Sequence, residues 1–176
     1  MTLTRLFALG FTLILTACGQ GSSPADGTSP YDVQAAAPGQ AQCFTTSAAD
    51  NAKGAAATSA VRRAQGQVPV RANDVLARAA AAHACDMAKR GFMSHAGSTT
   101  TGPRPRAKAL GFSPQIIAEN IAAGPFSLDR VLAEWNASSG HLSNILIPQM
   151  TDFGIGRAIG SDGRTVFWAA VYSTPG

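Results

Sequence analysis

The sequence has few charged, aromatic and cysteine residues. Of its 176 residues, 14% are charged and 7% are aromatic, and only three are cysteine. It has no long block of like charge and no basic stripe with interleaved aromatic residues, so nucleic acid is not an expected partner. The short basic groups Arg62-Arg63, Lys89-Arg90 and 104–108 are expected to lie on the solvated surface.

The sequence also lacks the short motifs that identify common hydrolases and zinc sites. It contains no Cys-x-x-Cys pair, no His-Glu-x-x-His motif and no nucleophile-elbow serine. These absences leave no local signature for serine, cysteine or zinc-dependent catalysis.

The apolar run nearest in length to a membrane span lies at the N-terminus. Residues 6–15 follow Arg5 and are mostly apolar. This run is too short for a spanning helix and is typical of a signal peptide. The run ends at Thr16-Ala17-Cys18, which resembles the bacterial lipoprotein signal, in which the cysteine is acylated. An ordinary secretory signal is the alternative.

We therefore expect residues 1–17 to be a signal peptide and a lipid on Cys18 to anchor the protein to a membrane. The expected location is the extracytoplasmic side of the cell envelope. Because Gly19 rather than Asp follows the cysteine, resemblance to Gram-negative lipoproteins implies the outer membrane if the source is Gram-negative. Loss of Arg5 with the leader would lower the formal net charge from +4 to +3.

Two cysteines remain once Cys18 is assigned to the lipid. Cys43 and Cys85 form an even pair in a chain expected to reach an oxidising compartment, so we predict a disulfide between them. Two separate buried thiols are the alternative.

The composition divides the rest of the chain into a tether and a domain. Residues 18–40 are rich in Gly, Ser, Pro and Ala and are expected to be flexible. The domain, residues 41–176, combines segments of helical and strand character, which predicts an α+β fold with a small antiparallel sheet. Helices are predicted over 43–65, 74–90, 106–110, 128–137 and 139–146, and strands over 115–122, 153–159 and 165–172. Expected helix-end residues are Thr46 or Ser47 for the first helix, and Asn73, Gly91 and Ser127 for the later ones.

A group of polar residues lies within an otherwise apolar part of the domain. Such groups need hydrogen-bond partners when buried, so they form either a structural network or a binding site. The group consists of His95, Glu119, Asn120, Trp135, His141 and Asn144.

The order of these motifs resembles the CAP superfamily of cysteine-rich secretory, antigen 5 and pathogenesis-related proteins, especially its bacterial single-domain branch. The resemblance covers about residues 43–173 and implies a three-layer α-β-α sandwich with a central antiparallel sheet and a wide surface cleft. The matching motifs are His83-Ala84-x-Asp86-Met87-Ala88, Phe92-x-Ser94-His95, Arg106 with Gly111-Phe112, Ala118-Glu119-Asn120-Ile121-Ala122-x-Gly124, Trp135-x-x-Ser138-x-Gly140-His141-x-x-Asn144-Ile145-Leu146, Gly154-Ile155-Gly156 and Phe167-Trp168.

In animal and plant members of this superfamily, the cleft carries two histidines and two acidic residues. Carried over by motif, these imply His95, His141 and Glu119 here. The second acidic position is Ser138 in this sequence, so it departs from the tetrad, as bacterial members commonly do.

Two functions follow as hypotheses. The first is a non-enzymatic envelope module whose cleft binds a lipid, glycan or peptide ligand, lined by His95, Glu119, Ser138, His141 and Asn144. The alternative is a zinc-dependent hydrolase in which His95 and His141 hold the metal and Glu119 is the candidate catalytic base. A purely structural role, with both histidines donating hydrogen bonds to Glu119, is also open.

Two further side chains have expected structural roles. His83 is expected to be a packing histidine within its helix, and Asn144 either to cap or to bond the backbone of the cleft.

Overall fold

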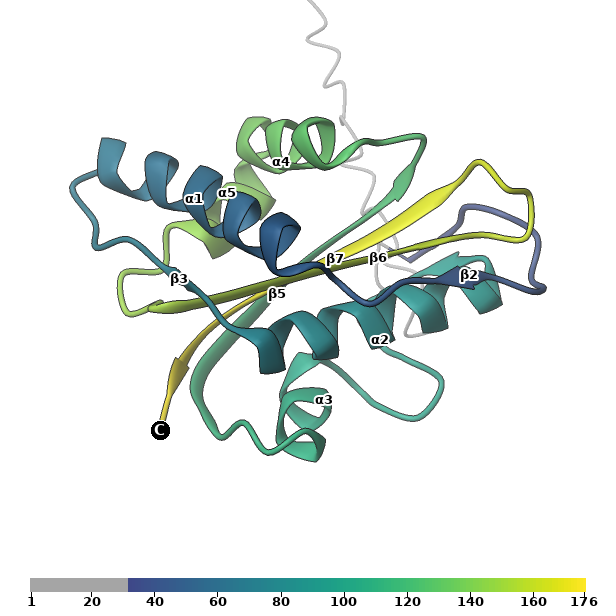
Figure 1. Cartoon of the computed structure of the whole chain (residues 1–176), viewed down its shortest axis with the longest axis horizontal. Helices are drawn as coiled ribbons and strands as arrows, with labels where there is room; N and C mark the ends of the chain where they lie inside the picture. The colour runs from purple at the N-terminus through teal and green to yellow at the C-terminus, as the bar shows by residue number, and fades with distance from the viewer. Residues whose placement is uncertain (1–31) are drawn as a thin grey trace, which may run out of the picture.

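The computed structural model describes residues 32–176, which form an α+β sandwich of three layers (Figure 1). The middle layer is a five-stranded sheet in the order β2-β6-β7-β5, and β3 also pairs with β6. The predicted signal peptide, Cys18 and residues 19–31 lie outside the described residues. The sheet strands are β2 Gln42–Cys43, β3 Arg71–Ala72, β5 Pro114–Gly124, β6 Asp152–Ile159 and β7 Val166–Pro175.

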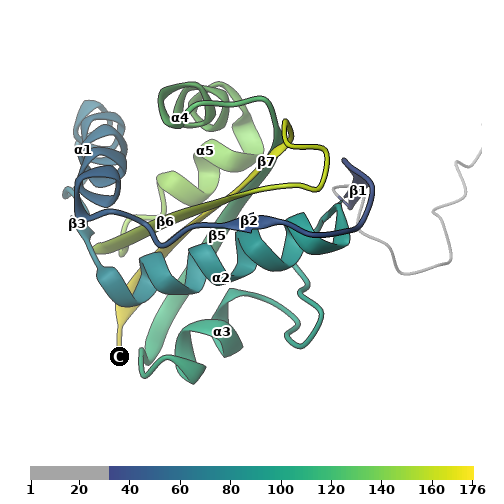
Figure 2. The same ribbon diagram turned by 45° about the vertical axis from the view of Figure 1, so that its right-hand side comes forward.

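Helices cover both faces of this sheet. Figure 2 shows α2 and α3 on one face and α1, α4 and α5 on the other. Each face has its own hydrophobic core, one around Trp135, Phe153 and Tyr172 and the other around Leu76, Met87 and Phe167. The helices are α1 Ala48–Ala64, α2 Asp74–Arg90, α3 Pro103–Ala109, α4 Leu128–Ala137 and α5 Ser139–Ile145. Among the helices of residues 32–176, none is both long and apolar enough to cross a membrane.

The predicted helix ends are confirmed by their hydrogen bonds. Asn73 Oδ1 accepts from the backbone N–H groups of Val75 and Leu76, and Ser127 Oγ accepts from that of Arg130. Gly91 follows α2 with a φ of 63°, a conformation that glycine adopts at little cost. Short side chains next to each helix therefore determine where α2 and α4 begin and end.

Glycines allow the helices to lie directly on the sheet. A Cβ atom at Gly156 would lie 2.2 Å from the backbone nitrogen of Ala81 in α2, and one at Gly154 would lie 2.2 Å from that of Ala77. On the opposite face, a Cβ atom at Gly54 in α1 would lie 2.7 Å from the ring of Phe153. Gly54, which weakens the sequence signal for a helix, is thus required by packing.

Several elements differ from the sequence-based prediction. The helical pattern from residue 43 starts too early, because residues 42–43 pair with β6, and the helix begins at Ala48, capped by Ser47, one of the two expected caps. The short helix α3 begins at Pro103, not at residue 106, since proline suits a first helical turn. The sheet is not wholly antiparallel, because β3 runs parallel to β6.

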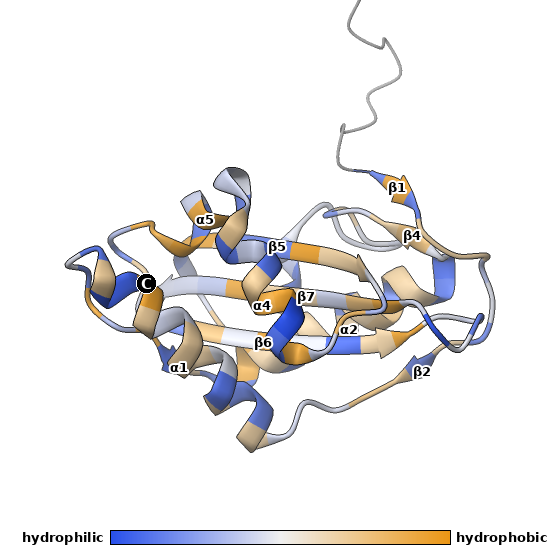
Figure 3. Ribbon diagram, turned by 90° about the horizontal axis from the view of Figure 1, so that it is seen from above, coloured by the Kyte–Doolittle hydropathy of each residue, from blue (hydrophilic) through white to orange (hydrophobic). Residues whose placement is uncertain are grey.

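Part of the expected tether is hydrogen-bonded to the domain. Strand β1, Val33–Gln34, pairs with strand β4, Phe92–Met93, and the two lie together as a separate pair in Figure 3. The backbone N–H of Gly39 also donates to the carbonyl of Lys89 at 2.9 Å. Within the described residues, the segment from 33 to 39 is therefore attached to the end of α2 rather than free.

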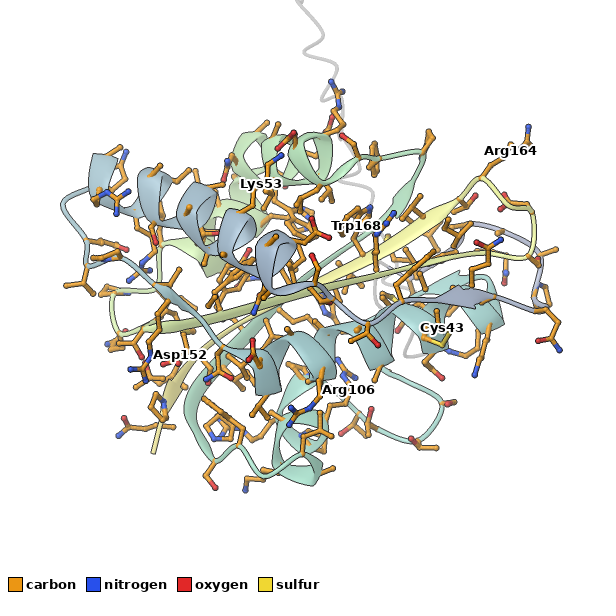
Figure 4. The ribbon with its side chains drawn as sticks, viewed as in Figure 1. Cys43, Lys53, Arg106, Asp152, Arg164 and Trp168 are labelled. Carbon is orange, nitrogen blue, oxygen red and sulfur yellow. A yellow bond between two sulfur atoms is a disulfide. The ribbon has the colours of Figure 1, made fainter. Side chains whose placement is uncertain are left out.

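The predicted disulfide is present. Cys43 in β2 is bonded to Cys85 in α2, across 42 residues of sequence, and Figure 4 labels Cys43 at this position. The bond ties an edge strand of the sheet to the helix that covers it.

Two of the basic segments that were expected on the surface contain a buried arginine, Arg62 in α1 and Arg106 in α3. Arg62 is fully buried. Its guanidinium donates hydrogen bonds to five backbone carbonyls, those of Val68, Ile145, Ile147, Pro148 and Met150. The assignment of Arg62 to the surface is therefore wrong, because these carbonyls lie more than 80 residues away in four of the five cases and no local pattern marks them.

Candidate functional site

Glu119 lies on β5, and only 4% of its surface is exposed. Its Oε1 atom accepts a hydrogen bond from Nδ1 of His95 at 3.0 Å. Its Oε2 atom accepts one from Nη2 of Arg106 at 2.6 Å. Both carboxylate oxygens therefore have a protein partner.

Arg106 and His83 complete the surroundings of this carboxylate. Arg106 comes from α3 and also donates to the carbonyl of His95 and to Oγ1 of Thr100, each at 3.1 Å. His83 comes from α2, and its Nε2 atom lies 3.7 Å from Oε1 of Glu119 and 2.9 Å from the carbonyl of Ser94. We call Glu119, His95, Arg106 and His83 the Glu119 cluster.

Burial and charge act in opposite directions on the pKa of Glu119. Burial raises it, whereas the hydrogen bond from His95 and the interactions with His83 and Arg106 lower it, and the net pKa lies below the ordinary value. Burial also lowers the pKa of His83 to about 4. The cluster at neutral pH is thus an ionised carboxylate against a guanidinium, with a neutral His83 beside it.

The other side of the site is built from α5. Asn144 Nδ2 donates to the backbone carbonyl of Glu119 at 3.2 Å and to Oδ1 of Asn120 at 2.9 Å. Asn120 Nδ2 donates in turn to the carbonyl of His141 at 3.1 Å. These bonds join α5 to β5 and confirm the prediction that Asn144 binds cleft backbone.

All five predicted site residues line one cavity. This cavity has a volume of about 270 Å³ and is lined by His95, Glu119, Ser138, Ser139, Gly140, His141 and Asn144. A second cavity of about 270 Å³ shares His95, Ser138 and His141 with it. We call the two together the cleft. The structure thus brings the five predicted residues together. Ligand binding by these residues stays a prediction.

His141 does not complete the predicted histidine pair on Glu119. In the described part of the chain, no hydrogen bond or ion pair joins His141 to Glu119, and Nδ1 of His141 is buried without a hydrogen-bond partner. Its ring centroid lies 6.5 Å from that of Trp135. Burial and the neighbouring His95 lower the pKa of His141. The structural hypothesis in which both histidines donate to Glu119 therefore holds for His95 alone.

The zinc hypothesis does not fit this arrangement. Zinc ligation by Glu119 would compete with the hydrogen bonds that its two oxygens accept from His95 and Arg106. A fixed guanidinium at 2.6 Å also opposes a divalent cation at the same carboxylate. Within residues 32–176, no group of three or more His, Cys, Asp or Glu side chains is arranged to hold a metal ion.

Sequence reasoning missed two members of the Glu119 cluster. Arg106 was expected on the surface and His83 was expected only to pack, although both are part of the motifs shared with the CAP superfamily. His83 does pack, with 1% of its surface exposed, but it also contacts the carboxylate. Its place in the motif, three residues before Asp86, was the available signal.

Comparison with known proteins agrees with this fold. The chain is 34% identical to the protein YkwD of Bacillus subtilis (strain 168) over 99 residues, which is 56% of this chain and 38% of that protein. Its structure is similar to that of an outer surface protein from Borrelia burgdorferi, with a TM-score of 0.65 and 18% identity over 77% of this chain and all of that chain.

A further similar structure is that of an extracellular protein containing an SCP domain from Bacillus anthracis str. Ames. Its TM-score is 0.63 and its identity 23%, over 71% of this chain and 40% of that chain. The model of the CAP family, the cysteine-rich secretory protein family, matches residues 55–172. Because this match spans more than half of the sequence, the chain belongs to the CAP family.

Proposed function

We propose that this protein is a non-enzymatic binding module of the cell envelope, whose cleft holds an amphipathic ligand of the lipid, glycan or peptide class. The observation that carries the proposal is the division of the cleft into an apolar and a polar half, which meet at His95, Ser138 and His141. A ligand that spans both halves needs an apolar part and a hydrogen-bonding part.

The apolar half follows β5 and α4. Its lining includes Ile121 and Ala122 of β5, Phe126, and the indole of Trp135, which is fixed by a hydrogen bond from Nε1 to the carbonyl of Ile121 at 3.2 Å. Apolar and aromatic walls of this kind provide most of the binding energy in small-molecule sites.

The polar half is lined by side chains that can form hydrogen bonds. Nδ1 of His141 has no partner among the described residues, and Ser138 and Ser139 border the same cavity. Such groups orient a ligand and provide specificity rather than affinity.

The state of Glu119 favours binding over catalysis. A general base needs a lone pair that can reach the substrate proton, and Glu119 directs its two oxygens to His95 and Arg106. Its depressed pKa further weakens it as a proton acceptor. Glu119 thus supports the wall of the cleft instead of reacting with a ligand.

The proposed location depends on the N-terminal residues and on the relatives. The leader-like run before Cys18 supports export and lipid anchoring. Two proteins of similar structure are described as an outer surface protein and an extracellular protein, which supports a place outside the cytoplasm.

The test measures the binding of one probe from each ligand class, with tryptophan fluorescence as the signal. The probes are dodecanoate, a chitotriose and an extended amphipathic peptide. Ser138→Phe fills the point where the two halves meet, and Ala137→Phe is the matched control at the exposed neighbour. We expect at least one probe to bind, with affinity reduced about tenfold or more by Ser138→Phe and unchanged by Ala137→Phe.

Two outcomes would contradict the proposal. One is that none of the three probes binds at a site sensitive to Ser138→Phe. The other is hydrolysis of an ester or peptide by the purified chain that is abolished by Glu119→Gln while folding is retained, which would favour the enzyme hypothesis.

A further inference from the structure

A separate cavity lies behind the Glu119 cluster, between α2, the loop at residues 97–100, and α3. Its volume is about 230 Å³. Of the described residues that line it, none belongs to the cleft. Arg106 of α3, which is labelled in Figure 4, is one of the lining residues. We call this space the α2–α3 cavity.

Two buried nitrogen atoms of residues that line the α2–α3 cavity have no hydrogen-bond partner. They are Nε of Arg106 and Nδ1 of His83, and the exposed fractions of the two residues are only 8% and 1%. Both side chains end at the same Glu119 carboxylate, through Nη2 of Arg106 at 2.6 Å and Nε2 of His83 at 3.7 Å. The two unpartnered atoms therefore belong to neighbouring groups.

The chemistry of these two atoms is complementary. Arg106 Nε always carries a hydrogen and can only donate. The Nε2 atom of His83 lies 2.9 Å from the carbonyl of Ser94, which can only accept, so Nε2 carries the hydrogen of the neutral ring. Nδ1 of His83 is consequently an acceptor. The residues that line the cavity therefore carry one unpartnered donor and one unpartnered acceptor.

Apart from Thr99, the other polar side chains that line the cavity already have partners. The carboxylate of Asp86 accepts from Ser98 and Arg90, and Oγ1 of Thr100 accepts from Arg106. The rest of the lining is largely apolar and includes Ala79, Ala82, Ala109 and Leu110. Leu110 is 39% exposed, so an apolar surface continues to the outside.

We propose that the α2–α3 cavity is a second ligand site, which binds a small aliphatic alcohol with its hydroxyl group inward. The hydroxyl oxygen accepts from Nε of Arg106, the hydroxyl hydrogen is donated to Nδ1 of His83, and the alkyl chain lies along the alanines and Leu110. A hydroxyl group fits because it is both a donor and an acceptor. This site is independent of the ligand proposed for the cleft.

The probe is 1-hexanol, added to the full chain labelled with nitrogen-15, and the signal is the Nε–H resonance of Arg106. Dipropyl ether is the matched ligand, because it has as many carbons and can accept from Arg106 but cannot donate to His83. We expect a saturable shift of the resonance with 1-hexanol and binding of the ether weaker by about tenfold or more.

A pair of variants locates the site. Ala109→Phe places a ring at the exposed mouth of the cavity, and Lys108→Phe makes the same change at the exposed neighbour that does not line it. The shift should be lost in the first variant and kept in the second.

Three results would overturn the proposal. They are the absence of a saturable shift, equal binding of the ether, and a shift that Ala109→Phe leaves intact. Persistent magnetisation transfer from the Arg106 Nε–H to a long-lived water molecule, unchanged by 1-hexanol, would likewise show that water alone satisfies these atoms.

Discussion

Arg106 Nη2 lies 2.6 Å from Oε2 of Glu119, and both side chains are buried. This ion pair provides the positive charge that the carboxylate needs in the protein interior. It connects α3 to β5, and through His95 it reaches the loop that borders the cleft. The shape of the cleft therefore depends on a pair that lies beneath it.

Removal of Arg106 should leave an uncompensated buried carboxylate. We expect Arg106→Met to lower the free energy of unfolding by about 3–5 kcal/mol, measured by urea denaturation. In the double variant with Glu119→Gln, the free energy of unfolding should fall by clearly less than the sum of the two single decreases, because the ion pair is lost only once. Lys108→Met, at an exposed position of the same helix, is the control. Additive losses would mean that the two side chains do not stabilise each other.

Stability should fall as the pH drops from about 6.5 to about 4. The pKa of His83 is about 4 in the folded chain, against an ordinary value of 6.5, so in this window the unfolded chain binds a proton that the folded chain does not. The loss is on the order of 3 kcal/mol at the acid end. His141 contributes in the same direction, because its pKa is also lowered.

The measurement is urea unfolding at pH 7, 5.5 and 4 for the native chain and for His83→Gln. Glutamine can still donate to the carbonyl of Ser94 but does not titrate. The stability of the His83→Gln variant should therefore depend less steeply on pH. An equal slope in the two proteins would assign the pH dependence to other groups.

A methyl group at Gly156 should be strongly destabilising. The added Cβ atom would lie 2.2 Å from the backbone nitrogen of Ala81, and neither the strand nor α2 can move without disturbing the core between them. We expect Gly156→Ala to lower the free energy of unfolding by about 3 kcal/mol or more. At Gly140, the described residues leave open space around such an atom, so Gly140→Ala should change stability by less than about 1 kcal/mol. Thermal unfolding of both variants tests the contrast.

Arg62 should be more important for stability than its exposed neighbour Arg63. Arg62→Met would leave five backbone carbonyls without their donor, including those of residues 145, 147 and 150 at and beyond the end of α5. We expect a loss of at least about 3 kcal/mol and faster amide hydrogen exchange in the segment 145–150. Arg63→Met, on the solvent side of α1, should cost less than about 0.5 kcal/mol. Similar stabilities for the two variants would show that water replaces the lost donors.

The parts of the fold that depend on near neighbours were predicted from the sequence. The ends of α2, the start of α4 at Ser127 and the final hairpin follow from residues that act within one helical turn or one strand pair. The pairing of Cys43 with Cys85 followed from counting cysteines in an exported chain. The ordered motifs of the CAP family identified His95, Glu119, Ser138, His141 and Asn144, which do line one cavity.

The tertiary structure alone decided how these residues are used. The packing of α1, α3 and α5 on the sheet places Arg106 against Glu119 rather than in solvent. The same packing decides whether His141 reaches that carboxylate and whether Arg62 meets the carbonyls of a distant loop. Local sequence patterns report the propensity of a few neighbouring residues and the burial of a face. They do not report which buried donor meets which acceptor, because those partners are joined by the packing of the whole domain.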